Sequence, residues 1–538
     1  MLLLNEESLR DEDAWKAAGF EIPGFDRSAV AARTYENPFW IHFGAGNIFR
    51  AFQAMAVQKL LNEGVIDTGL VVCEGYDYEI ISGMNDPHDN LSILATLKRD
   101  GTVEKTVVGS VTESYALDSE DEKSFLRLKE IFSKKSLQMA TFTITEKGYG
   151  ICNSSGEVPD DIAQDYINGP KRPVSYLGKV TALLYERYIN GALPIAMVSM
   201  DNCSHNGDKL YEAINSFAAV WEDGGLCQKG FKEYAGSREK VSYPWTMIDK
   251  ITPRPDDTVK KMLEDSGVGN MDTIVTSKNT FIAPFVNSEE CEYLVIEDDF
   301  PNGRKPLEKA GFLFTDRSTV DKVEKMKVCT CLNPIHTSLA IFGCLLGYTK
   351  ISDEMKDDDL RKMAEIVGYR EGLPVVTDPG IIKPKDFIDA VIKVRVPNPF
   401  MPDTPQRIAC DTSQKLPIRF GQTLKRYMAD DELDVNSLTV IPLVFAGWLR
   451  YLMAIDDEGN SFERSPDPRL SELSEKIAKL KFTDNTDAEI ILGPLLEDET
   501  LFGVNLKEAR IADKVLDYFK ELNAQKGAVR MALKKYCK

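Results

Sequence analysis

The chain has 538 residues, of which 43% are hydrophobic and 28% charged, a composition typical of a globular protein. This length predicts two domains, and no apolar run approaches the roughly 20 residues of a membrane span. The formal net charge of −20 argues against nucleic acid as a partner, because phosphate contacts need clustered Lys and Arg. It still allows a small anionic substrate in a local basic pocket.

Residues 1–36 are predicted to form a polar N-terminal extension with short helical pieces. Three leucines near its start are followed by acidic residues, so the segment lacks the basic region and the long apolar stretch of a signal peptide. The ten cysteines follow no disulfide-scaffold spacing. Together these features predict a cytoplasmic protein with reduced thiols.

The next elements have the order of a βαβ dinucleotide-binding unit. An apolar run over 38–43 ends at a Gly-Ala-Gly turn, a helical pattern covers 49–61, and a β-branched-rich run over 69–73 ends at Glu74. In such a unit, glycines let the backbone approach a pyrophosphate at the helix N-terminus. The acid after the second strand accepts hydrogen bonds from the adenosine ribose.

The glycine turn taken alone is a weak signal, because it lacks the third glycine of the GxGxxG pattern and is often only a tight turn. Its context favours cofactor binding. A carboxylate at Glu74 would repel a 2′-phosphate and therefore favours NAD over NADP, with Asp77 as the alternative acid. The predicted cofactor contacts of this unit are Gly44, Gly46, Asn47, Ile48, Phe49, Arg50 and Glu74.

Two further apolar runs, 139–145 and 193–199, are each followed by polar residues. The carboxyl ends of parallel strands face the ligand crevice, which favours Glu146 as a cofactor contact and Asn202 as a donor to a substrate oxygen. On its residues alone the first segment is better explained as a solvated loop, whereas a helix N-cap explains the second segment equally well. The alternation of such runs with helical patterns predicts a largely parallel sheet with crossover helices.

After about residue 315 helical patterns dominate, and they cover 316–348, 355–368, 384–395, 437–455 and 505–535. We therefore predict an α/β fold. A dinucleotide-binding domain is expected over 37–295, and a mostly α-helical substrate and catalytic domain over 296–538.

The most informative segment places a Lys, an Asn and a His within ten residues of an otherwise apolar helical pattern. Lysine is rarely buried without a partner or a function. Lys327 is a candidate general base, Asn333 a donor to a developing oxyanion, and His336 a group that orients or donates. Cys329 and Cys331 beside His336 fit no common zinc spacing, so no metal is predicted.

Three isolated residues are weaker candidates for substrate contacts. Asp249 follows an apolar run, where it is a candidate for binding a substrate hydroxyl, although such a residue is usually a surface or capping group. Arg407 and Lys415 lie in an apolar, proline-punctuated region. Arg grips a carboxylate with two hydrogen bonds and Lys acts as a point charge, whereas the alternative is a pair of surface ion pairs.

Taken together, these motifs resemble the long-chain mannitol dehydrogenase family, and within it most closely the fructuronate reductases (D-mannonate oxidoreductases). The resemblance covers about residues 40–455. It rests on HFGAGNIFRAFQA, TITEKGY, SMDNCSHNGD, TMIDKITP, the Lys/Asn/His segment, RIACDTSQKLPIR and FAGWLRYL, in that order.

The resemblance implies a Rossmann-like N-terminal domain, a mostly helical C-terminal domain, NAD as cofactor and metal-independent hydride transfer. It implies a sugar acid or polyol as the partner, with no nucleic acid and no membrane, in a monomer or small homo-oligomer. It assigns acid/base catalysis to Lys327, the oxyanion contacts to Asn202 and Asn333, substrate binding to His336, Asp249, Arg407 and Lys415, and a proton path to Glu324.

One departure concerns the spacing, because Lys precedes Asn by five residues in these relatives and by six here. One extra residue turns a helix face by about 100°. Either a π-helical turn absorbs it, as happens at functional sites, or Lys327 is not the base and Lys325 is a weaker substitute. Pro334 is a further candidate for distorting the helix.

D-Fructuronate and D-mannonate are the expected substrate pair, followed by the tagaturonate pair of a tagaturonate reductase and the mannitol pair of a mannitol 2-dehydrogenase. A catalytically silent, NAD-binding sugar-acid sensor would bind NADH without turnover. A zinc dehydrogenase would lose activity to a chelator.

Overall fold

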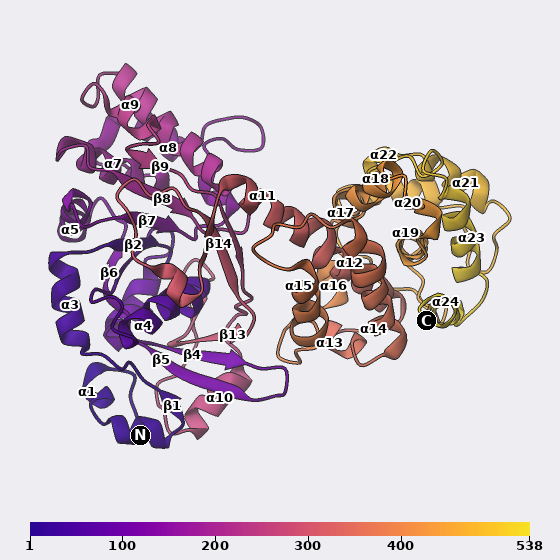
Figure 1. Ribbon diagram of the computed structural model, residues 1–538, viewed down its shortest axis with the longest axis horizontal. Helices are drawn as coiled ribbons and strands as arrows, with labels where there is room; N and C mark the ends of the chain where they lie inside the picture. Colours follow the sequence, from indigo (N-terminus) through magenta and orange to yellow (C-terminus); the bar gives the residue numbers. More distant parts are fainter. The chain divides into compact units, whose positions relative to one another are not determined.

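The structure, a computed structural model, describes residues 1–538 and consists of two compact units. The first unit contains Met1–Lys98 and Thr102–Asp321, and the second contains Arg99–Gly101 and Lys322–Lys538. Strands and helices make up the first unit, whereas the second is built of helices (Figure 1).

A six-stranded sheet forms the centre of the first unit, with the order β6-β3-β2-β7-β8-β9 and every neighbouring pair parallel. The strands are β2 (Trp40–Phe43), β3 (Leu70–Glu74), β6 (Val111–Ala116), β7 (Met139–Phe142), β8 (Ile195–Ser199) and β9 (Val241–Ser242). This confirms the predicted parallel sheet. The chain runs outward from β2 to β6 and then returns to β7, so the strand order reverses between β2 and β7, where ligands bind in open α/β sheets.

Both faces of this sheet are covered, which explains why its strands read as continuous apolar runs. Ile41 and Phe43 of β2 join a core with α5, α7 and α8, whereas the alternating residue Trp40 joins the core that contains α4. The helices of this unit are α1 (Glu6–Leu9), α2 (Glu12–Ala17), α3 (Arg27–Glu36), α4 (Ala54–Asn62), α5 (Glu122–Ser133), α6 (Asp160–Asn168), α7 (Tyr176–Ile189), α8 (Asn206–Asp223), α9 (Phe231–Gly236) and α10 (Asp257–Asp265).

Smaller sheets complete the first unit. Their orders are β1-β5-β4-β13, β10-β14-β15 and β11-β12. The strands are β1 (Phe20–Glu21), β4 (Ser92–Leu97), β5 (Val103–Val108), β10 (Thr246–Asp249), β11 (Ile274–Val275), β12 (Phe281–Ile282), β13 (Phe285–Glu289), β14 (Tyr293–Glu297) and β15 (Leu313–Thr315). Because β14 pairs with both β10 and β15, the first unit extends to Asp321, beyond residue 295.

The N-terminal extension, residues 1–36, packs on the first unit. Trp15 is fully buried, and β1 pairs in parallel with β5. Arg27 donates hydrogen bonds to the carbonyl oxygens of Gly109 at 2.9 Å and Val111 at 3.2 Å. The extension is therefore part of the folded core of this unit.

The second unit confirms the predicted helical half. The expected helix over 384–395 is α15 followed by a π-helical turn, Val391–Arg395, whereas the pattern over 505–535 is divided at Gly527, which has φ +76°. The helices are α12 (Asn333–Leu345), α13 (Ile351–Glu354), α14 (Asp358–Glu365), α15 (Pro384–Ala390), α16 (Pro405–Ile408), α17 (Thr412–Arg419), α18 (Gly421–Ala429), α19 (Val440–Leu452), α20 (Leu470–Ile477), α21 (Ala488–Leu496), α22 (Glu499–Phe502), α23 (Ala512–Leu522) and α24 (Ala528–Tyr536).

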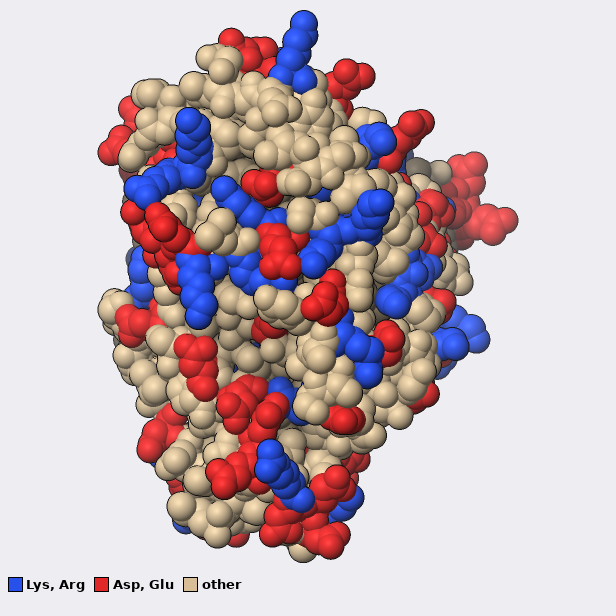
Figure 2. All heavy atoms as spheres, turned by 90° about the vertical axis from the view of Figure 1, so that its left-hand side faces the viewer, with Lys and Arg blue, Asp and Glu red and all other residues tan.

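The helical stretch Arg317–Leu345 is long and apolar enough by composition to cross a membrane. However, 78% of its apolar window is buried inside the structure, which is typical of a core helix. On the face shown in Figure 2, basic and acidic side chains are intermingled rather than gathered into one basic surface.

Candidate active site

The glycine turn after β2 lies at the point where the strand order reverses. Gly44 has φ +115°, and a Cβ atom there would lie 2.4 Å from the carbonyl oxygen of Thr143, which follows β7. Only glycine fits this position. A Cβ atom at Gly46 would meet nothing within 4 Å, so this glycine faces open space just before the helix that begins at Asn47.

Glu74 ends β3, as predicted, and its carboxylate holds the glycine turn. Its oxygens accept hydrogen bonds from the backbone N–H groups of Ala45 at 2.8 Å, Tyr76 at 2.9 Å and Asp77 at 3.2 Å. Burial raises the pKa of Glu74 despite these bonds. The Asp77 carboxylate accepts a bond from the Thr276 hydroxyl at 2.7 Å. Both acids therefore have structural partners at the place where a ribose contact is expected.

At the start of the helix after the glycine turn, the large side chains of Phe49 and Arg50 are buried, so the backbone N–H groups are the polar groups left for a ligand. Phe49 stacks on the buried His42 ring with centroids 4.3 Å apart. The Arg50 guanidinium donates to the Ala283 carbonyl at 2.8 Å and to Asn47 Oδ1 at 2.9 Å, and burial lowers the pKa of Arg50 to about 10. The first N–H groups of a helix have no acceptor within the helix, so those of residues 47–49 suit an anionic ligand.

Asp201 joins the loops that follow β7 and β8. Its carboxylate accepts the N–H groups of Ile144 at 2.8 Å and Thr145 at 2.9 Å, and the Tyr149 hydroxyl at 2.6 Å. Burial raises the pKa of Asp201. Thr145 has φ +65°, which is unfavourable for a β-branched residue, and these bonds hold it in that conformation. The exposed Glu146 forms an ion pair with Lys209 at 2.6 Å.

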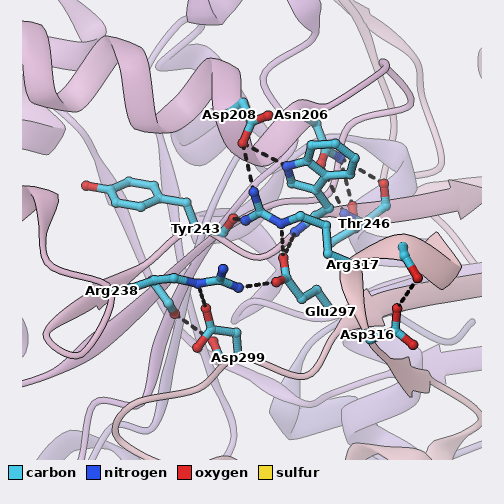
Figure 3. Close-up of polar contacts among 12 residues, drawn as sticks. Asn206, Asp208, Arg238, Tyr243, Thr246, Glu297, Asp299, Asp316 and Arg317 are labelled. Atoms are coloured by element: carbon cyan, nitrogen blue, oxygen red, sulfur yellow. Dashed lines mark hydrogen bonds and ion pairs between the residues drawn. The ribbon is translucent and has the colours of Figure 1, made fainter. Parts of the chain in front are cut away.

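The loop that carries Asn202 is anchored by the buried Asn206. Its amide nitrogen donates to the Ser199 carbonyl at 3.2 Å, the Asp201 carbonyl at 2.9 Å and the Thr246 hydroxyl at 2.8 Å. Its amide oxygen accepts the Thr246 N–H at 3.0 Å (Figure 3). Asn202 is exposed within this anchored loop. The same bonds fix the start of β10, the strand that ends at Asp249.

The helix that leads to Lys327 starts from a charged network in the first unit. Arg317, the first residue of α11 (Arg317–Met326), donates to Glu297 at 2.9 Å, Asp208 at 3.1 Å and the Tyr243 carbonyl at 3.3 Å (Figure 3). Arg238 pairs with the opposite oxygen of Glu297. This network fixes the beginning of α11.

A π-helical turn, Lys327–Cys331, follows α11 directly. The N–H of Leu332 donates to the Lys327 carbonyl at 3.1 Å, which is the five-residue step of a π-helix. Of the two alternatives that the spacing left open, the structure therefore contains the π-turn, and it lies between Lys327 and Asn333. Pro334 lies in the first turn of α12, where its missing N–H has no intrahelical partner to lose.

The predicted residues of this segment lie on successive turns of the second unit. Lys327 is 4% exposed, and Asn333 and His336 are half-buried. Glu324, also half-buried, precedes Lys327 by one helical turn. This arrangement places a buried lysine, a half-buried amide and a half-buried imidazole along one helical stretch.

Lys415 and Arg407 have different surroundings. The exposed Arg407 pairs with Asp403 one turn earlier. Lys415 is half-buried and donates to the carbonyl oxygens of Ile408, at 3.0 Å, and Cys410. Burial and the charge of Arg419 lower the pKa of Lys415.

Both halves of the chain are similar to the domains of one known family. The model of the mannitol dehydrogenase Rossmann domain matches residues 39–309, and that of the mannitol dehydrogenase C-terminal domain matches residues 319–523. The chain belongs to the mannitol dehydrogenase family. It is therefore an oxidoreductase of the polyol and sugar-acid dehydrogenase class, with the Rossmann-like and helical domains that the resemblance implied.

Relatives match over nearly the full length. The D-mannonate oxidoreductase of Thermotoga maritima is 51% identical and covers 98% of each chain. The D-mannonate oxidoreductase of Escherichia coli is 27% identical, covering 89% of this chain and 91% of that protein. The solved structure of Pseudomonas fluorescens mannitol 2-dehydrogenase, a ternary complex with NAD and D-mannitol, is 25% identical with a TM-score of 0.67 and covers 99% of each chain.

Three residues that position the predicted site residues were not predicted from the sequence. Asp201 and Asn206 lie in the quoted motif SMDNCSHNGD and position the loop around Asn202. Arg419 ends the motif RIACDTSQKLPIR and donates to the Asn333 carbonyl at 3.5 Å and the Thr337 hydroxyl at 2.5 Å. Its distance of four residues from Lys415, one helical turn, was the available signal.

Replacing Asn206 by alanine is expected to lower the free energy of unfolding by about 2–4 kcal/mol, because the buried N–H of Thr246 loses its acceptor and the carbonyl oxygens of Ser199 and Asp201 each lose one of their donors. Denaturant unfolding measures this change, and kcat/KM is expected to fall with it. Asn190→Ala, at an exposed helix end, is the control. Equal unfolding midpoints for the two variants would contradict the anchoring role.

Proposed function

We propose that the protein interconverts D-fructuronate and D-mannonate, with NAD as cofactor, a lysine as general acid/base and no metal. The observation that carries the proposal is the π-turn that begins at the buried Lys327, because a π-turn is a way for a helix to accommodate one extra residue between Lys327 and Asn333. The 51% identity to a D-mannonate oxidoreductase supports this substrate pair.

The residues at the end of β2 suit a dinucleotide. Gly44 is closed against Thr143 and fixes the turn, whereas Gly46 faces open space. The N–H groups of residues 47–49 are assigned to the pyrophosphate, and Glu74, with Asp77 as the alternative, to the adenosine ribose. The exposed Glu146 is assigned to the edge of the same cofactor site. When bound, NADH supplies the hydride from nicotinamide C4 to the carbonyl carbon.

The protein's own groups manage the charge and the proton. In reduction, the amides of Asn202 and Asn333 donate hydrogen bonds to the carbonyl oxygen as it becomes an alkoxide. The ammonium group of Lys327 then gives that oxygen a proton, and in oxidation neutral Lys327 takes it back. Glu324, one turn earlier, is assigned to the return of the proton to solvent.

The other predicted residues are assigned to the substrate. His336, Asp249, Arg407 and Lys415 bind hydroxyl or carboxylate groups and hold the carbonyl in position for hydride transfer. Removal of a residue that only orients the substrate is expected mainly to raise KM, whereas removal of Lys327 is expected to lower kcat.

The test is NADH oxidation with D-fructuronate, D-tagaturonate and D-fructose side by side, in the presence of EDTA. We expect the largest kcat/KM with D-fructuronate and no effect of the chelator. Activity with D-tagaturonate or D-fructose alone would overturn the substrate assignment. NADH binding without turnover on all three would favour a sensor, and loss of activity to EDTA would reveal a metal-dependent enzyme.

A further inference from the structure

Arg419 lies at the C-terminal end of α17, beside the first turn of α12. Both of its hydrogen bonds leave from Nη1, toward the Asn333 carbonyl at 3.5 Å and the Thr337 hydroxyl at 2.5 Å. These bonds orient the guanidinium next to the turn that carries Asn333 and His336. The other edge of the group, formed by Nε and Nη2, has no protein acceptor.

Lys415 precedes Arg419 by one helical turn and adds a second positive charge. Neither side chain forms an ion pair with an acid. Burial lowers the pKa of Arg419 to about 10, and burial together with the charge of Arg419 lowers the pKa of Lys415. Two half-buried cations in proximity cost free energy unless an anion binds between or beside them.

Arg407 has the opposite character. Its side chain is 67% exposed and forms an ion pair with Asp403. The RIACDTSQKLPIR motif contains the cations Arg407, Lys415 and Arg419. Only Arg419 is a partly buried guanidinium that is held in one orientation and whose Nε and Nη2 have no protein acceptor. That edge matches the two oxygens of a carboxylate, which a neutral ketose or polyol lacks.

We propose that the Nε/Nη2 edge of Arg419, with Lys415 beside it, binds the carboxylate of the hexuronate and so sets the preference for sugar acids over neutral ketoses. The inference rests on the proposed function, since it names the group that recognises the acidic end of that substrate. Arg419 then has two roles, because the side chain that binds the substrate carboxylate also donates a hydrogen bond to the backbone of Asn333.

The experiment compares kcat/KM for D-fructuronate and D-fructose in the wild-type protein and in Arg419→Met. We expect the ratio of the two values to fall by about 100-fold, mainly through KM for D-fructuronate, because a charge-assisted pair of hydrogen bonds is lost. Arg419→Lys is expected to recover part of the ratio, since lysine keeps the charge without the planar edge.

Arg426→Met is the matched control. Arg426 lies on the neighbouring helix α18 and donates only to protein groups, Val375 and Thr377. Its removal is expected to leave the substrate ratio unchanged even if stability falls. Equal losses on both substrates in Arg419→Met would show a purely structural role for Arg419 and overturn the inference.

The wild-type values separate the two proposals. A wild-type protein that reduces D-fructuronate, with an unchanged ratio in Arg419→Met and Arg419→Lys, keeps the proposed function and overturns the carboxylate site. A wild-type protein that reduces D-fructose but not D-fructuronate overturns both. If Arg419→Met fails to fold, the ratio in Arg419→Lys and the Kd of that variant for D-mannonate against D-mannitol decide the inference.

Discussion

Replacing Lys327 by methionine is expected to lower kcat for D-fructuronate reduction by about 1,000-fold, because the alkoxide loses its proton donor. Methionine is unbranched and of similar length, so it fills the buried position, where Lys327 is 4% exposed, without opening a cavity. The Kd for NADH is expected to change little. Steady-state rates and NADH fluorescence titration measure the two quantities separately.

Lys325→Met is the control for this substitution. Lys325 is exposed two residues earlier on the same helical stretch, so its loss is expected to leave kcat within about threefold of the wild-type value. Normal turnover in Lys327→Met, with a large loss in Lys325→Met, would move the acid/base role to Lys325.

Replacing Gly44 by alanine is expected to destabilise the first unit by at least about 2 kcal/mol and to abolish NADH binding. The backbone has φ +115° there, and the new Cβ atom would lie 2.4 Å from the Thr143 carbonyl oxygen. The turn must therefore shift, and the N–H groups of the following helix shift with it. Thermal unfolding and NADH titration measure both effects.

Gly46→Ala separates the effect on NADH binding from the effect on stability. Its Cβ atom would meet no protein atom within 4 Å, so stability is expected to stay within about 1 kcal/mol of the wild-type value. NADH affinity is nevertheless expected to fall, because the methyl group occupies the space assigned to the pyrophosphate. Wild-type stability in Gly44→Ala, or wild-type NADH affinity in Gly46→Ala, would contradict this description of the glycine turn.

The sequence by itself determined the succession of strands, turns and helices along the chain. The strand, glycine turn, helix, strand and acid from Trp40 to Glu74 are consecutive, and apolar periodicity identifies each element without knowledge of its neighbours. The helix over 384–395 was predicted for the same reason. The π-turn after Lys327 was one of the two alternatives that the Lys-to-Asn spacing left open, and the structure contains it.

Only the tertiary structure decided which elements lie next to each other. The strand order that reverses between β2 and β7 depends on pairings that the apolar pattern does not encode. Asp201 binds the N–H of Ile144, 57 residues away, and Arg419 binds the Asn333 carbonyl, 86 residues away. The apolar periodicity of a segment indicates which side of its helix or strand faces the core. The residue that it contacts there depends on how distant segments of the chain pack. The positioning roles of Asp201 and Arg419 were therefore identified only from the fold.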